Sequence, residues 1–283
     1  MWIACSSRST ASFYTIAAAA AAVLFCLTEG EAFIVVPSKF EFKFQSRSNM
    51  ALRSISSSNA LLELPKLSMQ YFVLRHGQSL ANVEGIISSD PSISTVQHGL
   101  SEAGQAQARR AGQDVCQQLA GKRVAIWSSD FLRARETAQH VADAILKSSH
   151  THHEHEHGVS LYQDQVLLET RLRERFFGTL NGGPDSEYPS VWKYDALDSA
   201  HEEFGVESVD SVMTRTTQLV TELNAYDQEV DACILVAHGD VLQIIQTAFQ
   251  KWDGRYHRQL PHLDTAVLRP LHLSPQPSSP PSI

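Results

Sequence analysis

The sequence has few cysteines and no excess of basic residues, and each shortage argues against particular classes of protein. Its four cysteines form no CxxC pair, which argues against a zinc ribbon, a thioredoxin-type site or a disulfide framework. Acidic residues outnumber basic ones by 31 to 23, so the net charge is −8. Binding nucleic acid through its phosphates takes a basic face, and we therefore expect no nucleic-acid partner.

The remaining composition is ordinary. The chain has 283 residues, of which 43% are hydrophobic, with 14 glycines and 11 prolines. These values argue against a wholly disordered, collagen-like or coiled-coil chain. The length predicts one or two domains.

Residues 1–32 differ from the rest of the chain. Arg8 is followed by twenty residues without a charge, Ser9 to Thr28, and then by Gly30-Glu31-Ala32. A basic residue, an apolar run and small residues flanking one position are typical of a secretory signal peptide, here cleaved after Ala32. The alternatives are a retained single-span anchor and a buried core helix. We expect contact with a membrane only if the segment is retained.

Residues 33–68 form a serine-rich, basic segment with five Lys or Arg against two Glu. This composition is typical of an organelle transit peptide. A signal followed by Ala-Phe and such a segment resembles the bipartite plastid presequence of algae with secondary plastids. The resemblance predicts a plastid location. A disordered linker behind a secretion signal, with a secreted or endomembrane protein, and a membrane-anchored protein are the alternatives.

Beyond Ser68, short apolar runs alternate with segments of helical periodicity. Strands are expected where the apolar residues are continuous: residues 70–74, 124–127, 166–168, 233–237 and 265–268. Helices are expected behind the caps Ser101 and Asp130 and at 209–223 and 240–250. This alternation predicts an α/β domain over residues 69–275, a three-layer sandwich whose mostly parallel sheet is covered by helices on both faces.

Several segments stand apart from this pattern. The tract His150 to His157 holds five histidines and is predicted to form a mobile insertion, because its neighbours are polar; binding of a transition metal is the alternative. Residues 182–203 are polar and aromatic and are expected to form an irregular crossover. Residues 276–283 are a Pro/Ser tail that is too polar to pack. Cys116 and Cys233 lie in apolar periodic segments and are expected to be inert buried thiols.

Two histidines, each followed by a glycine, come directly after two of the predicted strands. Arg75-His76-Gly77 follows the first, and His238-Gly239 follows the fourth. The carboxyl ends of parallel strands meet at one edge of a sheet, where ligands bind. Arg133 lies in the first turn of the helix behind another strand and reaches the same edge.

Two arginines and two histidines around one point would form a pocket for a dianion. Arginine offers paired donors that match the geometry of phosphate, and amides at helix starts add positive potential. Beyond Ser68 the chain has 27 acidic against 17 basic residues. A cationic cluster in such a domain requires a reason, and binding of phosphate supplies one.

The residues at this edge resemble the motifs of the histidine phosphatase superfamily, in its phosphoglycerate mutase-like branch (branch 1). The similar segments, in the family's order, are Leu74 to Ser79 with Asn82 (the phosphohistidine signature), Ser129 to Ala138 (the second arginine motif), Leu172 to Gly178 (the acid/base glutamate) and Val236 to Gly239 (the second histidine). The match covers the whole predicted domain.

The resemblance implies covalent catalysis by a histidine. Neutral His76 would attack phosphorus and become phosphohistidine, which splits one difficult hydrolysis into two steps. Glu174 would protonate the leaving oxygen and then take a proton from water. The resemblance implies no metal and no other cofactor.

The resemblance also assigns the phosphate-binding residues. Arg75, Arg133 and His238 would neutralise the phosphoryl oxygens in the transition state. Asn82 would add a hydrogen bond to the phosphate or to a residue that holds it. Gly239 would let the backbone approach the ligand closely.

Other residues near these motifs are expected to have ordinary roles. Arg171, Arg173 and Arg175 belong to a charge run and are predicted to lie at the surface, with contact between one of them and an anionic substrate as the alternative. Trp127 and Phe131 are predicted to pack in the core.

Two departures from the family's mutases bear on the reaction. Residues 84–91 lack the Thr-Gly-Trp stretch of those enzymes, and no pair of basic residues for a bisphosphate lies between Leu180 and Glu207. The sequence therefore favours a metal-independent phosphatase that hydrolyses small phosphomonoesters, either sugar phosphates or phosphoglycerate-like molecules. The alternatives are phosphoglycerate mutase-type phosphoryl transfer and a catalytically weak module that binds phosphorylated ligands.

Overall fold

The computed structural model describes residues 24–28, 31–35, 63–151, 158–226 and 229–276. The chain divides into two units, Met1–Ser58 and Asn59–Ile283. In the first, Leu24–Thr28 (β1) pairs antiparallel with Glu31–Val35 (β2). Most of the expected signal and transit segments lie outside the described residues and stay predictions. No helix among the described residues is both long and apolar enough to span a membrane.

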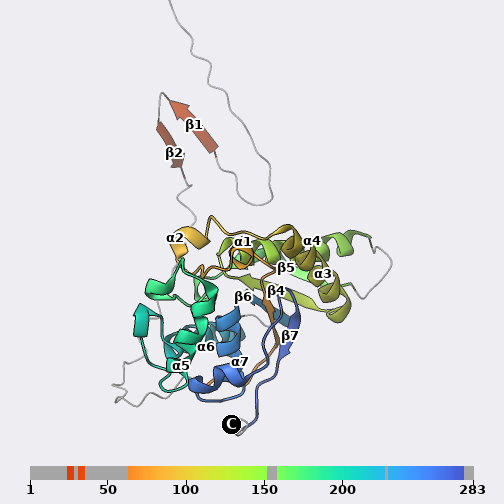
Figure 1. Cartoon of the computed structure of the whole chain (residues 1–283). Helices are drawn as coiled ribbons and strands as arrows, with labels where there is room; N and C mark the ends of the chain where they lie inside the picture. Colours follow the sequence, from red (N-terminus) through yellow and green to blue (C-terminus); the bar gives the residue numbers. More distant parts are fainter. Residues whose placement is uncertain (1–23, 29–30, 36–62, 152–157, 227–228, 277–283) are drawn as a thin grey trace, which may run out of the picture. The chain divides into compact units, whose positions relative to one another are not determined.

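A five-stranded sheet forms the centre of the second unit (Figure 1). Its strands are Gln70–Arg75 (β3), Arg123–Ser128 (β4), Ser160–Leu168 (β5), Ala232–Ala237 (β6) and Leu268–Leu271 (β7). They lie in the order β5-β4-β6-β3-β7. The first four run parallel, and β7 runs antiparallel to β3. The predicted mostly parallel sheet is confirmed.

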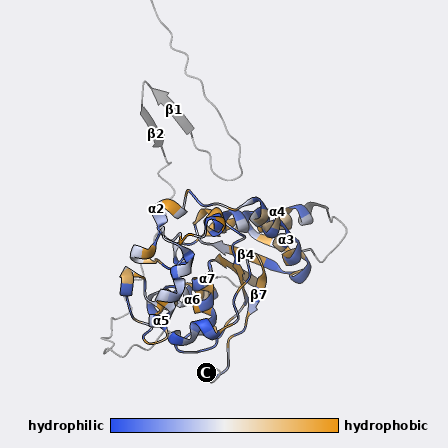
Figure 2. Cartoon of the chain, in the orientation of Figure 1, coloured by the Kyte–Doolittle hydropathy of each residue, from blue (hydrophilic) through white to orange (hydrophobic). Residues whose placement is uncertain are grey.

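Four helices cover the two faces of the sheet: Glu102–Gln118 (α3), Leu132–Thr151 (α4), Val209–Tyr226 (α6) and Gly239–Phe249 (α7). Successive strand residues point to opposite faces. Phe72 and Leu74 therefore pack in the core under α3 and α4, whereas Tyr71 and Val73 pack in the core under α6 and α7. Apolar residues accordingly run through the inner strands (Figure 2). The three-layer α/β prediction is confirmed.

The remaining helices are short and lie in the connections. They are Leu80–Glu84 (α1), Pro91–Ser94 (α2), Tyr188–Asp195 (α5) and the 3-10 turns Thr170–Leu172, Gly178–Leu180, Asp185–Glu187, Glu203–Gly205 and Gly254–Gln259. The crossover 182–203 is more regular than expected because it contains α5. Val191 of α5 packs with Ile87, Phe177 and Val206 in a small core of its own.

The start of α4 differs from its prediction, because Asp130 does not cap it. The hydroxyl of Ser129 accepts the backbone N–H of Phe131 at 3.2 Å, and the helix begins at Leu132. The Asp130 carboxylate instead receives Arg173 at 2.8 and 2.5 Å. The Asp130 side chain thus pairs with Arg173, which is distant in sequence, and does not accept a hydrogen bond from the start of α4.

Two strands have other bounds than the sequence predicts. β5 is longer than the expected 166–168 and contains Gln163 and Asp164 at φ 55° and 52°, beside a shift in its register with β4. β7 starts at Leu268 rather than Thr265. Ala266, at φ 57°, first donates its N–H to the Arg75 carbonyl at 2.9 Å. Pro270 then lies within β7, opposite Phe72.

The folded unit includes residues before the predicted boundary at 69. Leu64 is buried in the core, and Leu67 packs against it. Ser68 donates its N–H to Asn224 Oδ1 at 2.7 Å, and Asn224 Nδ2 donates to the Lys66 carbonyl at 2.9 Å. This entry segment, residues 63–68, is therefore attached to α6.

Most of the histidine tract lies outside the described residues. α4 extends to Thr151, and residues 152–157 are not described. The predicted insertion therefore stays a prediction, and metal binding stays its alternative. Residues 277–283 of the predicted tail also lie outside.

Candidate functional site

The loop behind β3 is fixed by close backbone packing. A Cβ on Gly77 would lie 2.5 Å from the carbonyl oxygen of Gly104, and one on Gly104 would lie 2.0 Å from the carbonyl of Gln78. Only glycine allows this approach of the loop to α3. The N–H of Gly77 also donates to Thr137 Oγ1 of α4 at 3.0 Å. The loop thus holds its neighbour His76 against both helices.

His76 is buried and its ring is fixed in one tautomer. Nδ1 lies 2.7 Å from the Gly77 carbonyl, which only accepts, so Nδ1 carries the proton and Nε2 keeps a lone pair. Arg133 Nε donates to Nε2 at 3.2 Å. Burial, followed by the charges of Arg133 and Arg75, lowers the pKa of His76 well below its usual value. The imidazole is therefore neutral, as a nucleophile requires.

Two guanidinium groups flank His76. Arg133 is buried and donates from Nη2 to the Ser88 carbonyl at 2.8 Å, whereas its Nη1 has no partner among the described residues. Burial lowers the pKa of Arg133 to about 10, which leaves it charged at neutral pH. Arg75 donates from Nη1 to His262 Nε2 at 2.8 Å, and its Nε has no described partner. Both arginines keep donors for an anion.

His238 lies beside His76, with ring centroids 5.1 Å apart, and receives the Phe131 ring edge-on at 5.2 Å. Ser129 Oγ accepts from the backbone and lies 3.0 Å from His238 Nε2. Nδ1 of His238 has no partner among the described residues. Burial and then Arg133 lower the pKa of His238, so the ring is a neutral donor.

Glu174 is the carboxylic acid of the site. Burial and then the negative charge of Asp240 raise its pKa to about 7, against the opposing effects of Arg133, Arg75 and the Arg175 N–H, which donates to Oε1 at 3.0 Å. A carboxyl with this pKa is partly protonated at neutral pH. It can therefore both give and take a proton.

These side chains surround a cavity of about 230 Å³. The predicted site residues that line it are Arg75, His76, Asn82, Arg133, Glu174 and Gly239. His238, whose ring lies 5.1 Å from that of His76, does not line the cavity. Asn82 Oδ1 accepts from Ser79 N and Oγ at 3.1 and 3.0 Å. The structure thus brings the predicted residues together at the carboxyl edge of the sheet.

The crossover supplies a wall of the cavity that the sequence did not assign. Tyr188 and Trp192 of α5 are stacked with centroids 5.5 Å apart, and the Arg258 guanidinium lies 3.6 Å above the Trp192 ring. Trp192 Nε1 donates to Asp240 Oδ2 at 3.2 Å, and Arg258 Nη1 lies 3.3 Å from Asp240 Oδ1. Arg258 comes from the 3-10 turn behind α7, so two distant segments meet here.

The surface prediction for Arg175 is wrong. Its side chain is fully buried and binds both oxygens of Asp195 at 2.8 Å. It also reaches Asp240 Oδ2 at 3.4 Å and donates from Nε to the Glu207 carbonyl at 2.6 Å. A charge run gives no sign of this, because the partners come from other segments. Arg175 thus joins α5, α7 and the residues before α6.

The neighbouring arginines and the aromatic residues follow their predictions. Arg171 and Arg173 are partly exposed and pair with Glu169 and Asp130. Neither lines the cavity. Phe131 is buried beside His238, and Trp127 packs against the core under α6 and α7.

The thiols are only partly as predicted. Cys233 is buried and Cys116 is half-buried. Burial raises the pKa of both thiols, which keeps them protonated.

An α/β sheet whose carboxyl edge carries two neutral histidines, two arginines and a proton-exchanging carboxyl defines a class of protein that handles phosphoryl groups. The sequence model of the histidine phosphatase superfamily (branch 1) matches residues 71–277. The chain therefore belongs to this family, as its motifs predicted.

Solved structures agree with this assignment. A mycobacterial glucosyl-3-phosphoglycerate phosphatase in complex with VO3 is 25% identical, with 71% of this chain and 90% of that chain covered and a TM-score of 0.57. Its native structure is 26% identical, with 71% and 89% covered and a TM-score of 0.53. A mycobacterial hydrolase is 25% identical, with 71% and 90% covered and a TM-score of 0.55. No curated protein matches the chain.

Proposed function

We propose that this protein is a metal-independent phosphatase that hydrolyses small phosphomonoesters through a phosphohistidine on His76. The observation that carries the proposal is that an unprotonated nucleophile and a carboxyl able to donate a proton lie in one cavity. His76 presents an unprotonated Nε2, and Glu174, with a pKa of about 7, lines the same cavity and can protonate a leaving oxygen. Nucleophilic attack and departure of an alkoxide need these two groups together.

The rest of the reaction follows from the cavity. Nε2 attacks phosphorus as the bond to the leaving oxygen breaks, and Glu174 gives that oxygen its proton. The carboxylate then takes a proton from water, which attacks the phosphohistidine and frees His76. Arg75 and Arg133 hold the phosphoryl oxygens in both steps, since each has a donor without a described partner.

The size of the cavity supports small substrates. Its volume of about 230 Å³ is below the range of roughly 300–1,000 Å³ that is typical for drug-sized ligands. The mycobacterial phosphatase named above, which acts on glucosyl-3-phosphoglycerate by its name, supports phosphatase rather than mutase chemistry.

The test is release of phosphate from a panel of small phosphomonoesters by the unit Asn59–Ile283, in EDTA, beside His76→Asn and the exposed control His272→Asn, which does not line the cavity. We expect metal-independent release by the parent and the control. Loss of a covalent nucleophile should lower turnover by about 10⁴-fold or more. Rapid acid quench with labelled substrate should trap phosphate on the parent but not on His76→Asn.

Two outcomes would overturn the proposal. Isomerisation of a phosphoglycerate that depends on a bisphosphate primer, without net release, would identify a mutase. Binding of inorganic phosphate or vanadate without turnover would identify a binding module.

For the location, we propose that residues 1–62 direct the folded unit to a plastid. The sequence pattern of the presequence supports this proposal. A fluorescent protein fused behind residues 1–62 should accumulate in the plastid of an alga with secondary plastids. Fluorescence in the medium, in the endomembranes or at a membrane would instead support the alternatives.

A further inference from the structure

The charges around the cavity fall into an inner and an outer group. The inner group contains buried Arg133 and partly buried Arg75 and Glu174, around buried His76. The outer group contains Asp185, Asp240, Arg258 and His262, which also line the cavity. The inner group meets the phosphoryl group under the proposed function, so the outer group meets the leaving group.

The inner group matches one dianion. Arg75 and Arg133 carry two positive charges. Glu174 must be protonated to act as the acid, and the pKa of His76 is too low for this ring to carry charge. Two positive charges face the two negative charges of a phosphomonoester, so the inner group has no charge left for a second anion.

The outer group has no spare positive charge. Its single arginine, Arg258, is held between the Trp192 ring at 3.6 Å and Asp240 Oδ1 at 3.3 Å. Asp240 Oδ2 also lies 3.4 Å from Arg175 Nη1. Arg175 Nη1 and Nη2, however, each donate to Asp195 at the shorter distance of 2.8 Å. The charge of Arg258 therefore cancels that of Asp240, and the charge of Arg175 cancels that of Asp195.

The remaining residues make the outer group negative. The pKa of His262 is lowered by burial and by Arg75, whose Nη1 donates to its Nε2, so this ring is neutral. Asp185 is exposed at the cavity and has no ion pair among the described residues. Its N–H donates to the Gly85 carbonyl at 2.8 Å, which fixes its backbone beside the cavity.

We propose that the cavity selects phosphomonoesters whose leaving group is neutral and hydroxylated, as in polyol and sugar phosphates, and rejects those whose leaving group carries a carboxylate or a second phosphate. This inference rests on the proposed phosphatase function. A carboxylate on the leaving group would meet the unpaired carboxylate of Asp185, whereas hydroxyl groups can donate to it. Tyr188 and His262 also line the cavity and carry polar groups for the same leaving group.

A matched pair of substrates tests the proposal. Glycerol 3-phosphate and 3-phosphoglycerate share a carbon skeleton and differ by a CH₂OH group in place of a carboxylate. We expect kcat/KM to be about tenfold higher for glycerol 3-phosphate, because the carboxylate of 3-phosphoglycerate is repelled by Asp185. Because the repulsion is electrostatic, high salt should reduce the ratio.

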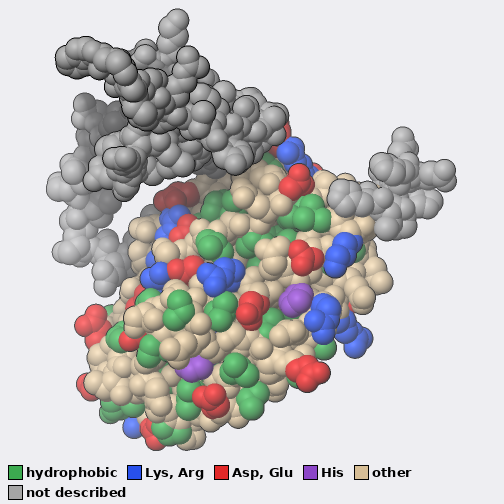
Figure 3. All heavy atoms as spheres, turned by 90° about the horizontal axis from the view of Figure 1, so that it is seen from above, with side chains coloured by type: hydrophobic (Ala, Val, Ile, Leu, Met, Phe, Trp, Pro, Cys, Tyr) green, Lys and Arg blue, Asp and Glu red, His purple; other side chains and the backbone are tan. Residues whose placement is uncertain are grey.

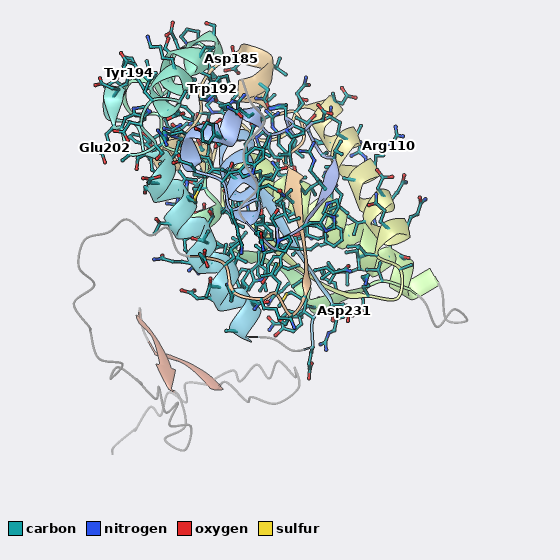
Figure 4. The ribbon with its side chains drawn as sticks, turned by 90° about the horizontal axis from the view of Figure 1, so that it is seen from below. Arg110, Asp185, Trp192, Tyr194, Glu202 and Asp231 are labelled. Atoms are coloured by element: carbon teal, nitrogen blue, oxygen red, sulfur yellow. The ribbon has the colours of Figure 1, made fainter. Side chains whose placement is uncertain are left out.

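The variant Asp185→Asn keeps the backbone hydrogen bond and removes the charge. It should lower the ratio severalfold, chiefly by raising kcat/KM for 3-phosphoglycerate. The matched control is Glu202→Gln, an exposed carboxylate of the same crossover that does not line the cavity (Figure 4). The control should leave the ratio unchanged.

The outcomes separate this inference from the proposed function. Equal or faster hydrolysis of 3-phosphoglycerate by the parent, or a ratio that neither salt nor Asp185→Asn changes, would overturn the selectivity and leave the phosphatase standing. No phosphate release from either substrate, or from the wider panel, would overturn the phosphatase itself.

Discussion

At the scale of residues, His76 and Glu174 have pKa values displaced in opposite directions within one cavity. Burial disfavours the charged form of each, so it lowers the pKa of the histidine and raises that of the acid. The result is a neutral nucleophile and a protonated acid in one pH range. A solvated pair would have to populate these states against its ordinary pKa values.

This pair predicts the pH dependence of kcat/KM. The protonated form of Glu174 prevails below its pKa of about 7 and falls as the pH rises through that value. Activity should therefore decrease on the alkaline side. On the acid side we expect the second ionisation of the substrate phosphate, near pH 6, to limit the rate before protonation of His76 does.

The variant that tests this profile is Asp240→Asn. Because the negative charge of Asp240 raises the pKa of Glu174, its removal should move the alkaline limb to lower pH. The exposed variant Asp253→Asn, whose carboxylate pairs with Arg255, should leave the limb in place. An alkaline limb that Asp240→Asn does not move would contradict the assignment of Glu174.

At the scale of elements, the Arg175 network determines where the acid lies. Arg175 follows Glu174 directly and is bound to Asp195 of α5, Asp240 of α7 and the Glu207 carbonyl. Breaking a buried ion pair costs about 3–5 kcal/mol. Arg175→Met should therefore destabilise the fold and release Glu174 from its position.

The leaving group separates these two effects. An alkyl phosphate needs a proton on its leaving oxygen, whereas p-nitrophenyl phosphate needs little help. In Arg175→Met we expect first-turnover rates to fall about 10²-fold for the alkyl ester, as for a lost general acid, with a much smaller loss for the nitrophenyl ester. Arg173→Met, at a partly exposed ion pair, is the control. Equal losses of rate for both esters would show that Arg175 stabilises the fold but does not position Glu174.

The elements also show what the sequence can predict. β3 and β6 are predictable because their residues are apolar on both faces, and the helices show clear spacing. The start of β5 is not predictable, since Gln163, Asp164 and Gln165 are polar residues on an edge. The burial of Arg175 depends on α5 and α7, which are distant in sequence. The motif residues were predictable because each directly follows a strand or belongs to a recognisable motif.

At the scale of the whole molecule, the folded unit begins before its family motifs do. The entry segment contributes buried Leu64 and three hydrogen bonds between Ser68 and Asn224, at 2.7 to 3.2 Å. Burial of one leucine contributes about 1.5–3 kcal/mol, and each hydrogen bond about 1 kcal/mol. Cleavage of a presequence should therefore occur upstream of Leu64.

A comparison of residues 59–283 with residues 69–283 checks this. Because the entropy of ordering the segment offsets part of these contributions, we expect the shorter chain to lose about 3 kcal/mol of stability and some 6–12 °C in Tm, measured by thermal unfolding. Asn224→Ala in the longer chain should reproduce part of the loss. Identical melting of the two chains would show that the entry segment contributes nothing to the fold.

The charged surface of the unit is mixed. On the face seen in Figure 3, acidic and basic side chains are interspersed over the described residues. The cationic residues that matter for the proposed reaction are instead at the cavity, where Arg133 is almost fully buried. Attraction of a phosphorylated substrate is therefore a short-range effect.

The two borders of the sheet also govern how copies of this protein meet. A border strand with free N–H and C=O groups is a template on which another chain can add. Along β5, the left-handed residues Gln163 and Asp164 interrupt that template, and along the four-residue β7, Pro270 lacks an N–H. Both borders of this five-stranded sheet therefore disfavour the addition of a strand from another copy.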